Sequence, residues 1–229
     1  MHDQRFPNES ATYREARNSL LREEIELRRQ TERVAELRRR LPAGGELPVD
    51  YRFQAASPNR DTDPDVTLST LFGEHDTLLV YSFMYGPAMN APCPSCSSII
   101  DSLDGVAPHL TQRAALAVVA RSEPARIRAW AERRGWHRLR LLSSANCSYN
   151  RDYGAETADG AQLPVLNVFQ RRGDRVHHHW ATELLYAPCD PGQDNRHVDA
   201  IWPLWGLLDL TPGGRGSDWR PGLLDDVPA

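Results

Sequence analysis

The chain has 229 residues, of which 40% are hydrophobic, 27 are basic and 31 are acidic, giving a formal net charge of −4 and a mean hydropathy of −0.57. This length allows one ordinary domain with extensions, or two small domains. The slightly acidic balance argues against a general nucleic-acid or membrane-surface binder, which is normally basic. Every basic residue is Arg, which excludes Schiff-base and other lysine-dependent chemistry.

No apolar run approaches the ~20 residues that a membrane-spanning helix needs. The N-terminus is charged and lacks the apolar stretch of a signal peptide, so we expect a soluble, cytoplasmic protein. The four cysteines are too sparse for a disulfide-stabilised scaffold.

A long helix is expected first, from about Ser10 to Leu41. Thr12 and Glu15 have the spacing of a capping box, and Pro42 ends the helix. Apolar residues recur along it every seven positions, at Tyr13, Leu20, Leu27, Val34 and Leu41. The helix either lies on the core by this stripe or forms a homodimer through it. Residues 1–45 are therefore interpreted as an N-terminal helical extension.

The rest of the chain alternates between β-rich apolar runs and short helical segments. Strands are expected at 51–54, 66–69, 77–84, 114–120, 139–143, 163–170 and 175–182. Helices are expected at 97–103, closed by Gly105, at 125–134, closed by Gly135, and at 199–210. This order predicts an α/β domain over 46–212, with a mostly parallel sheet, helices on both faces and an antiparallel hairpin at one side. Residues 46–76 are expected to be largely irregular, as is the tail 213–229.

The most informative motif is Cys93-Pro-Ser-Cys96, which follows a predicted buried strand and opens a predicted helix. Two cysteines at this spacing can close a small disulfide ring. Free backbone N–H groups at the helix start favour a thiolate on Cys93. Pro94 suits the first helical position because its missing N–H is not needed there. Cys96, one turn inside, would be the shielded resolving thiol.

The same spacing also occurs as half of a zinc site, so a metal site and two inert structural cysteines stay open as alternatives. Zinc would usually require a second Cys-x-x-Cys or His-x-x-His pair, and the chain has neither. Cys147, in a polar loop, and Cys189, in a Pro- and Gly-rich segment, have no assigned role.

Further motifs carry a resemblance to a known family. They are Tyr81-Ser-Phe-Met-Tyr-Gly-Pro87, Cys93-Pro-Ser-Cys-Ser97, Gly135-Trp136, Asn150-Arg-Asp-Tyr153 and Leu208-Asp-Leu-Thr-Pro212. With these motifs the chain resembles the thioredoxin-like proteins described as predicted dithiol–disulfide oxidoreductases, long catalogued as a domain of unknown function. The resemblance covers nearly the whole chain. It implies a thioredoxin-like fold with a mixed central sheet, in which Cys93 and Cys96 form the dithiol.

Pro164 immediately precedes a predicted strand, where thioredoxin-like folds place a cis-proline that faces the dithiol. We therefore expect Pro164 to be cis and to dock the substrate backbone; an ordinary strand-start proline is the alternative. Arg121 ends a predicted strand on the side where such sheets bind ligands, so it is a candidate for steadying a thiolate or an acidic substrate.

A run of three histidines, His177-His178-His179, supports a different chemistry. Strand alternation would place His177 and His179 on one face and Val176, His178 and Trp180 on the other. Thiolates and imidazoles together suit copper or zinc. The alternative function is thus a thioredoxin-fold metal enzyme or metal carrier that uses Cys93, Cys96 and His178, with His177 and His179 as weaker candidates.

The leading hypothesis is a dithiol–disulfide oxidoreductase that needs no bound cofactor. Its partners would be a disulfide-bearing protein or small thiol substrate and an external thiol reductant, with no nucleic acid and no membrane. A peroxidase is less favoured, because Asn90 stands where peroxiredoxins place a Thr or Ser before the reactive cysteine. A redox-inert binding module is the third possibility.

Overall fold

The computed structural model describes residues 4–57, 65–216 and 218–223. The chain divides into two compact units, Met1–Pro42 and Ala43–Ala229. Residues 58–64 of the expected irregular connection, and 217 and 224–229 of the expected tail, lie outside the described residues. Within the described ranges, every helix is too short or too polar to cross a bilayer.

The N-terminal unit is the helix α1 (Ala11–Arg39) and the residues that precede it. The backbone N–H of Tyr13 donates to the side chain of Ser10 over 3.1 Å, so Ser10 is the N-cap. The predicted cap at Thr12 is wrong, because Thr12 already lies in the first helical turn. Dimerisation through the seven-residue stripe of α1 stays a prediction.

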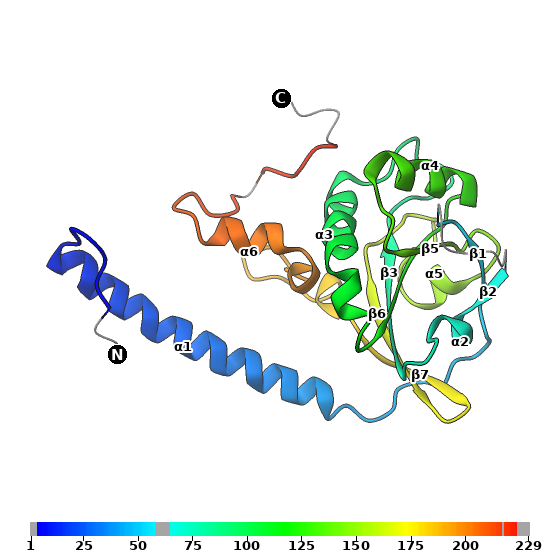
Figure 1. The fold of residues 1–229 in the computed structure, drawn as a ribbon, viewed down its shortest axis with the longest axis horizontal. Coiled ribbons are helices and arrows are strands. Elements are labelled where there is room, and N and C mark those ends of the chain that lie inside the picture. The colour runs from blue at the N-terminus through cyan, green and yellow to red at the C-terminus, as the bar shows by residue number, and fades with distance from the viewer. Residues whose placement is uncertain (1–3, 58–64, 217, 224–229) are drawn as a thin grey trace. The chain divides into compact units, whose positions relative to one another are not determined.

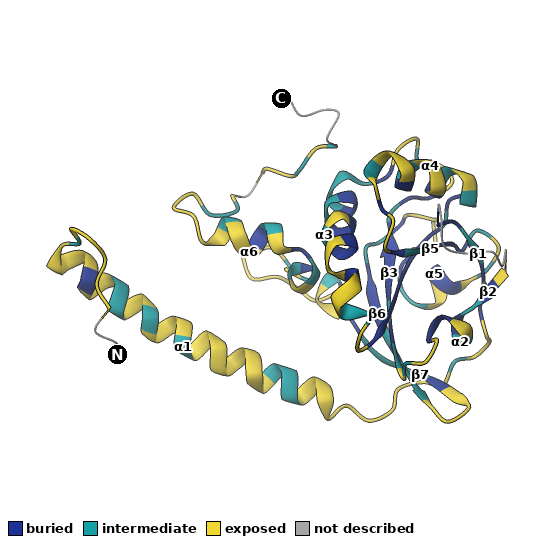
Figure 2. Cartoon of the chain, in the orientation of Figure 1, coloured by how far each residue is buried: buried dark blue, intermediate teal, exposed yellow. Residues whose placement is uncertain are grey.

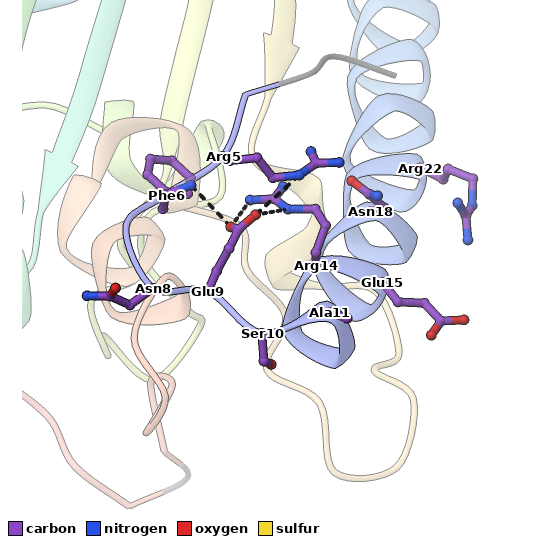
Figure 3. Close-up of a pocket in the computed structure, with 10 residues that line it drawn as sticks. All are labelled: Arg5, Phe6, Asn8, Glu9, Ser10, Ala11, Arg14, Glu15, Asn18 and Arg22. Carbon is purple, nitrogen blue, oxygen red and sulfur yellow. Dashed lines mark hydrogen bonds and ion pairs between the residues drawn. The ribbon is translucent and has the colours of Figure 1, made fainter.

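An ion pair folds the start of this unit back onto the helix (Figure 3). The Arg14 guanidinium donates two hydrogen bonds to the Glu9 carboxylate, one of them over 2.7 Å from Nε. The backbone N–H of Phe6 donates to the same carboxylate over 3.2 Å. These hydrogen bonds, with that from Arg14 the largest cause, hold the pKa of Glu9 below its usual value.

The second unit is built on one seven-stranded sheet in the order β2-β1-β5-β4-β3-β6-β7. The strands are β1 (Arg52–Ala55), β2 (Asp65–Thr67), β3 (Thr77–Phe83), β4 (Ala115–Ala120), β5 (Arg140–Ser143), β6 (Leu166–Arg172) and β7 (Arg175–Ala181). The β3–β4 and β4–β5 pairs are parallel, and the other pairs between these strands are antiparallel. The sheet is therefore mixed, which confirms the mixed central sheet that the resemblance implies. The element order alone suggests a mostly parallel sheet, and that part of the expectation is wrong, because two of the six pairs between these strands are parallel.

Helices cover both faces of the sheet (Figure 1). On one face, α3 (Pro94–Leu110), α4 (Pro124–Arg134) and α6 (Pro203–Asp209) contribute to a core with the buried side chains Phe83, Val118 and Leu141. On the other, α2 (Leu68–Leu71) and α5 (Tyr149–Asp152) contribute to a core with the buried side chains Val80, Ala117 and Phe169. The alternation of side chains along β3 and β4 supplies both cores.

The helix α3 is longer than the sequence suggests, because it continues through Gly105 and Pro108 to Leu110. Its buried stripe of Ile99, Ile100, Leu103 and Ala107 extends past Gly105, as the dark face of the helix in Figure 2 shows. Beyond Gly105, Ala107 is buried and Leu110 packs against the same core, so the helix gains apolar contacts after the glycine. Packing therefore overrides the predicted stop.

Strand β7 contains a β-bulge that changes the faces of its side chains. His178 pairs with Phe169, whereas Trp180 pairs with Val168, so His179 is an extra residue opposite these two. His178 consequently packs on Phe169 in the second core, whereas Trp180 packs against the first. The prediction that His178 and Trp180 share a face is wrong, because simple alternation does not survive a bulge.

The chain after β7 returns to the first face of the sheet. It forms two short 3-10 helices, η1 (Glu183–Leu185) and η2 (Asp199–Ile201), and then α6. The indole N–H of Trp202 donates to the Ser98 hydroxyl on α3 over 3.0 Å. Arg215 pairs with both Asp199 and Asp209, which ties η2 to α6. Residues near the C-terminus thereby lie beside the first turns of α3.

Candidate functional site

The two motif cysteines lie at the start of α3, which follows β3 in the chain. Cys93 is the N-cap of α3 and Pro94 its first residue, as the sequence predicts. The Cys93 N–H donates to the Met84 carbonyl over 3.1 Å, and the Cys93 carbonyl accepts from Ser97 N–H over 3.0 Å. Cys93 is half-buried and Cys96 is buried, and both are free thiols. The strand end and the helix start thus hold the two side chains together.

The two thiols have opposite acidities. The Cys96 thiol hydrogen-bonds to Cys93 and, with backbone N–H groups of Cys96 and Ser95, lowers the pKa of Cys93 to about 6 against the opposing effect of burial. Burial and the neighbouring Cys93 raise the pKa of Cys96 well above its usual value. At pH 7 about nine-tenths of Cys93 is therefore thiolate, while Cys96 stays protonated.

Tyr81 on β3 is the polar group beneath the dithiol. Its side chain is fully buried, and its hydroxyl approaches the Cys96 sulfur without a hydrogen bond of normal geometry. The contact partly counters the burial that raises the pKa of Cys96. Burial, together with the nearby thiols, raises the pKa of Tyr81 well above its usual value, so the hydroxyl keeps its proton.

Arg126 on α4 anchors the loop that leads to Cys93. Its guanidinium donates to the carbonyls of Pro87, over 3.3 Å, and Met89. It also lies over the Tyr85 ring, 4.6 Å from the centroid. The loop between β3 and α3 is thus fixed from the neighbouring helix.

A pocket of about 400 Å³ opens beside the dithiol. Its size falls within the range of small-molecule and peptide side-chain sites. Cys93, Ser95, Cys96 and Ile99 form one wall from α3. The other walls come from the residue that follows β3 and from the C-terminal third of the chain, with Met84, Pro164, Cys189, Asp194, Asn195, His197, Val198, Asp199, Trp202, Trp205 and Arg220.

Pro164 is in this pocket, as expected of a residue that faces the dithiol. The following residue, Val165, accepts a hydrogen bond from Ser82 N–H over 2.8 Å, which aligns this segment with the end of β3. No peptide bond among the described residues is cis, so the expected cis-Pro164 is wrong. The Leu163 N–H donates to the Ala155 carbonyl over 2.9 Å, and Pro164 follows this residue through a trans bond.

Arg121 is not among the residues that line the pocket. Its guanidinium donates to the carbonyls of Ser144, Ala145 and Cys147 over 3.0–3.2 Å and pairs with Glu156 at 3.0 Å. These contacts hold the loop after β5. The substrate-binding role expected of Arg121 finds no support in this geometry.

His178 lies on the face of the sheet opposite the dithiol. Its Nε2 is 2.9 Å from the Asn167 side-chain oxygen, and its ring packs on Tyr153 and Phe169. His177 Nδ1 is 3.2 Å from the Gly44 carbonyl. In the part of the chain that the structure describes, no three His, Cys, Asp or Glu side chains are grouped to hold a metal ion. The structure therefore does not bring Cys93, Cys96 and His178 together.

His197 is a pocket residue that sequence reasoning missed. Its Nδ1 is 2.7 Å from the Asn195 side-chain oxygen, whereas its buried Nε2 has no partner of normal geometry among the described atoms. Burial lowers its pKa below the usual value, so the ring is neutral at pH 7. No local spacing links His197 to Cys93, because the two meet only through the return of the chain to α3.

The strand order β7-β6-β3-β4, with a Cys-x-x-Cys pair at the start of the helix between β3 and β4, defines a thioredoxin-like protein. The chain belongs to the family described as "Bacterial protein of unknown function (DUF899)", whose model matches residues 3–224. A comparison with curated proteins finds no match.

Several solved structures are similar to the chain. A reduced 2-Cys peroxiredoxin of Plasmodium vivax shares 19% identity with a TM-score of 0.48, and the match covers 69% of this chain and 95% of that one. For AhpC of Enterococcus faecalis the identity is 14%, the TM-score 0.47 and the coverage 78% and 98%. For peroxidoxin BcpB of Mycobacterium tuberculosis these values are 18%, 0.44, 71% and 94%. Likeness at this level transfers no activity.

Proposed function

We propose that the protein is a thiol–disulfide oxidoreductase, with Cys93 as the attacking thiolate and Cys96 as the resolving thiol. The observation that carries this proposal is the placement of the pair at the start of α3, with Cys93 half-buried at a pocket and Cys96 buried behind it. The pKa values are displaced to match, downward for Cys93 and upward for Cys96. Thiol exchange needs one thiol that is ionised and accessible, and a second that is close enough to attack the mixed disulfide.

The reaction proceeds by two exchanges. The Cys93 thiolate attacks one sulfur of a substrate disulfide, the substrate S–S bond breaks, and its other sulfur leaves as a thiolate that takes a proton from water. Cys96 then loses its proton and attacks the Cys93 sulfur, which releases the second substrate thiol. The substrate has gained two electrons and the protein holds a Cys93–Cys96 disulfide, which an external thiol reductant reopens.

The pocket favours a substrate that presents a disulfide next to apolar groups. Trp202, Trp205 and Met84 supply apolar surface beside Cys93, and Pro164 lies where an approaching backbone would pass. This surface suits a disulfide within a peptide segment. We therefore propose a disulfide-bearing protein as the substrate and a soluble thiol as the reductant.

The test is to trap the first exchange. The Cys96→Ser/Cys189→Ser variant leaves Cys93 without a neighbouring thiol, so it should accumulate a mixed disulfide with insulin or glutathione at Cys93. The wild-type protein should accelerate insulin reduction by dithiothreitol, and the Cys147→Ser variant should match it. A Cys93→Ser variant that is as active as the wild type, or a trapped disulfide at Cys147, would refute the proposal.

A further inference from the structure

Three of the four cysteines line one pocket. Cys189 is exposed and borders the same 400 Å³ pocket as Cys93 and Cys96, although it is distant from them in sequence. Cys147 is not among the lining residues, and it packs against the core on the opposite face of the sheet. The half-buried Cys93 and the exposed Cys189 therefore line the same pocket, together with the buried Cys96.

The wall that carries Cys189 is fixed on both sides of this residue. Before it, the Tyr186 hydroxyl donates to the Gly154 carbonyl over 2.5 Å. Beyond Cys189, Asp194 pairs with Arg220 at 3.3 Å, and Asp199 pairs with Arg215 at 2.8 Å. Between η1 and η2 the chain forms turns but no helix or strand. These anchors keep Cys189 at the pocket, while the irregular backbone between them leaves its side chain free to adjust towards Cys93.

The two candidate resolving thiols differ in access. Cys96 is 1% exposed, and its raised pKa means that few molecules carry the thiolate at neutral pH. Cys189 is exposed, so its proton can pass directly to water. Once Cys93 carries a mixed disulfide, an exposed thiol in the same pocket competes well with the buried one.

We propose that Cys189 is a third redox thiol of this site, which takes the disulfide from Cys93 and presents it to the external thiol reductant. The inference rests on the proposed function of Cys93 as the attacking thiolate.

The Cys189 thiolate, formed by loss of a proton to water, attacks the Cys93 sulfur of the mixed disulfide. The Cys93–substrate S–S bond breaks, a Cys93–Cys189 bond forms, and the substrate thiolate leaves and is protonated. An external thiol then attacks the Cys189 sulfur and expels Cys93. A second external thiol releases Cys189, so two reductant thiols become one disulfide.

The acidity of Cys93 favours this route for reduction. A disulfide opens faster when the leaving sulfur has a low pKa. In a Cys93–Cys189 disulfide, attack at the exposed Cys189 expels Cys93, whose pKa is about 6. In a Cys93–Cys96 disulfide, the accessible sulfur is Cys93, and attack there must expel the poorly acidic, buried Cys96. The Cys189 form is therefore the more easily reduced.

The experiment compares two variants in a Cys147→Ser background. Cys96→Ser retains Cys93 with Cys189, and Cys189→Ser retains Cys93 with Cys96. Each is treated with oxidised glutathione at low protein concentration, its disulfides are mapped by peptide mass spectrometry, and its reduction by glutathione is timed. We expect an intramolecular Cys93–Cys189 disulfide in the first variant. Its exposed Cys189 sulfur should let glutathione reduce it several-fold faster than the Cys93–Cys96 disulfide of the second variant, although Cys96→Ser raises the pKa of the Cys93 leaving group in part.

Only glutathione adducts or intermolecular dimers in the Cys96→Ser variant would overturn the role of Cys189, and so would equal reduction rates. If the Cys189→Ser variant still forms the Cys93–Cys96 disulfide in that case, the proposed function stands without Cys189. If Cys93 forms no disulfide in either variant, both proposals fail.

Discussion

The thiol of Cys96 donates a hydrogen bond to the sulfur of Cys93, and this is the largest cause of the lowered pKa of Cys93. One proton therefore serves both residues, because it stabilises the thiolate of Cys93 while it keeps Cys96 neutral. The acidity of the accessible thiol is a property of the pair, with smaller contributions from the backbone N–H groups of Cys96 and Ser95.

Replacement of Cys96 tests this coupling. Cys96→Ala removes the donor, so the pKa of Cys93 should rise from about 6 towards the usual thiol value. Cys96→Ser keeps a hydroxyl donor and should raise it less. Thiolate absorbance near 240 nm, followed against pH in a Cys147→Ser/Cys189→Ser background, measures both variants. Equal pKa values in the two variants would show that the side-chain hydrogen bond is not the cause.

Tyr81→Phe tests the polar group beneath the dithiol. Loss of the hydroxyl should raise the pKa of Cys96 further and slow closure of the Cys93–Cys96 disulfide. The free energy of unfolding should change by less than about 1 kcal/mol, since the hydroxyl makes no normal hydrogen bond. Tyr149→Phe is the matched control, because its hydroxyl is also buried but belongs to the other core. Equal rates of disulfide closure in the two variants would show that the Tyr81 hydroxyl has no effect on the dithiol.

Arg126→Ala should loosen the loop that carries Cys93. Loss of its bonds to the Pro87 and Met89 carbonyls should lower the free energy of unfolding by about 1–2 kcal/mol. It should also slow alkylation of Cys93, because a looser loop holds the Cys93 sulfur less firmly against the backbone N–H groups that stabilise its thiolate. Arg128→Ala removes the same charge from the exposed side of α4 and should leave both quantities unchanged. Denaturant titration and timed alkylation measure them. If both variants lower the free energy of unfolding and the alkylation rate equally, Arg126 acts only through its charge.

His178→Gln tests the metal hypothesis. Because His178 lies on the far face of the sheet, zinc or copper(I) affinity of the reduced protein should be the same in the variant and the wild type. Calorimetric titration under reducing conditions measures that affinity. A loss of tenfold or more in the variant, roughly the least expected for a lost metal ligand or its supporting residue, would return His178 to the site.

The sequence alone could predict the elements that depend on local pattern. The apolar runs of β3 and β4, the hairpin β6–β7 and the position of Pro94 after Cys93 follow from residue type and spacing. The predicted stop at Gly105 is wrong, because tertiary packing of Ala107 and Leu110 extends α3 beyond it.

The parts of the site that the sequence could not predict come from distant segments. His197 and Cys189 reach the pocket only because Trp202 and Arg215 fasten the returning chain against α3 and α6. The bulge at His179 likewise has no local signal, and it alone moves Trp180 to the face opposite His178. Long-range contacts of this kind are not encoded in any short window of sequence.

The rate of iodoacetamide alkylation of Cys93 in the reduced wild-type protein, followed peptide by peptide against pH, tests the central claim most directly. Because the pKa of Cys93 is lowered, the thiolate should persist down to mildly acidic pH. The rate should be half-maximal near pH 6, fall about tenfold per unit below that value and be level above about pH 7. A rate that is half-maximal only near pH 8.5, the value of an ordinary thiol, would contradict the account.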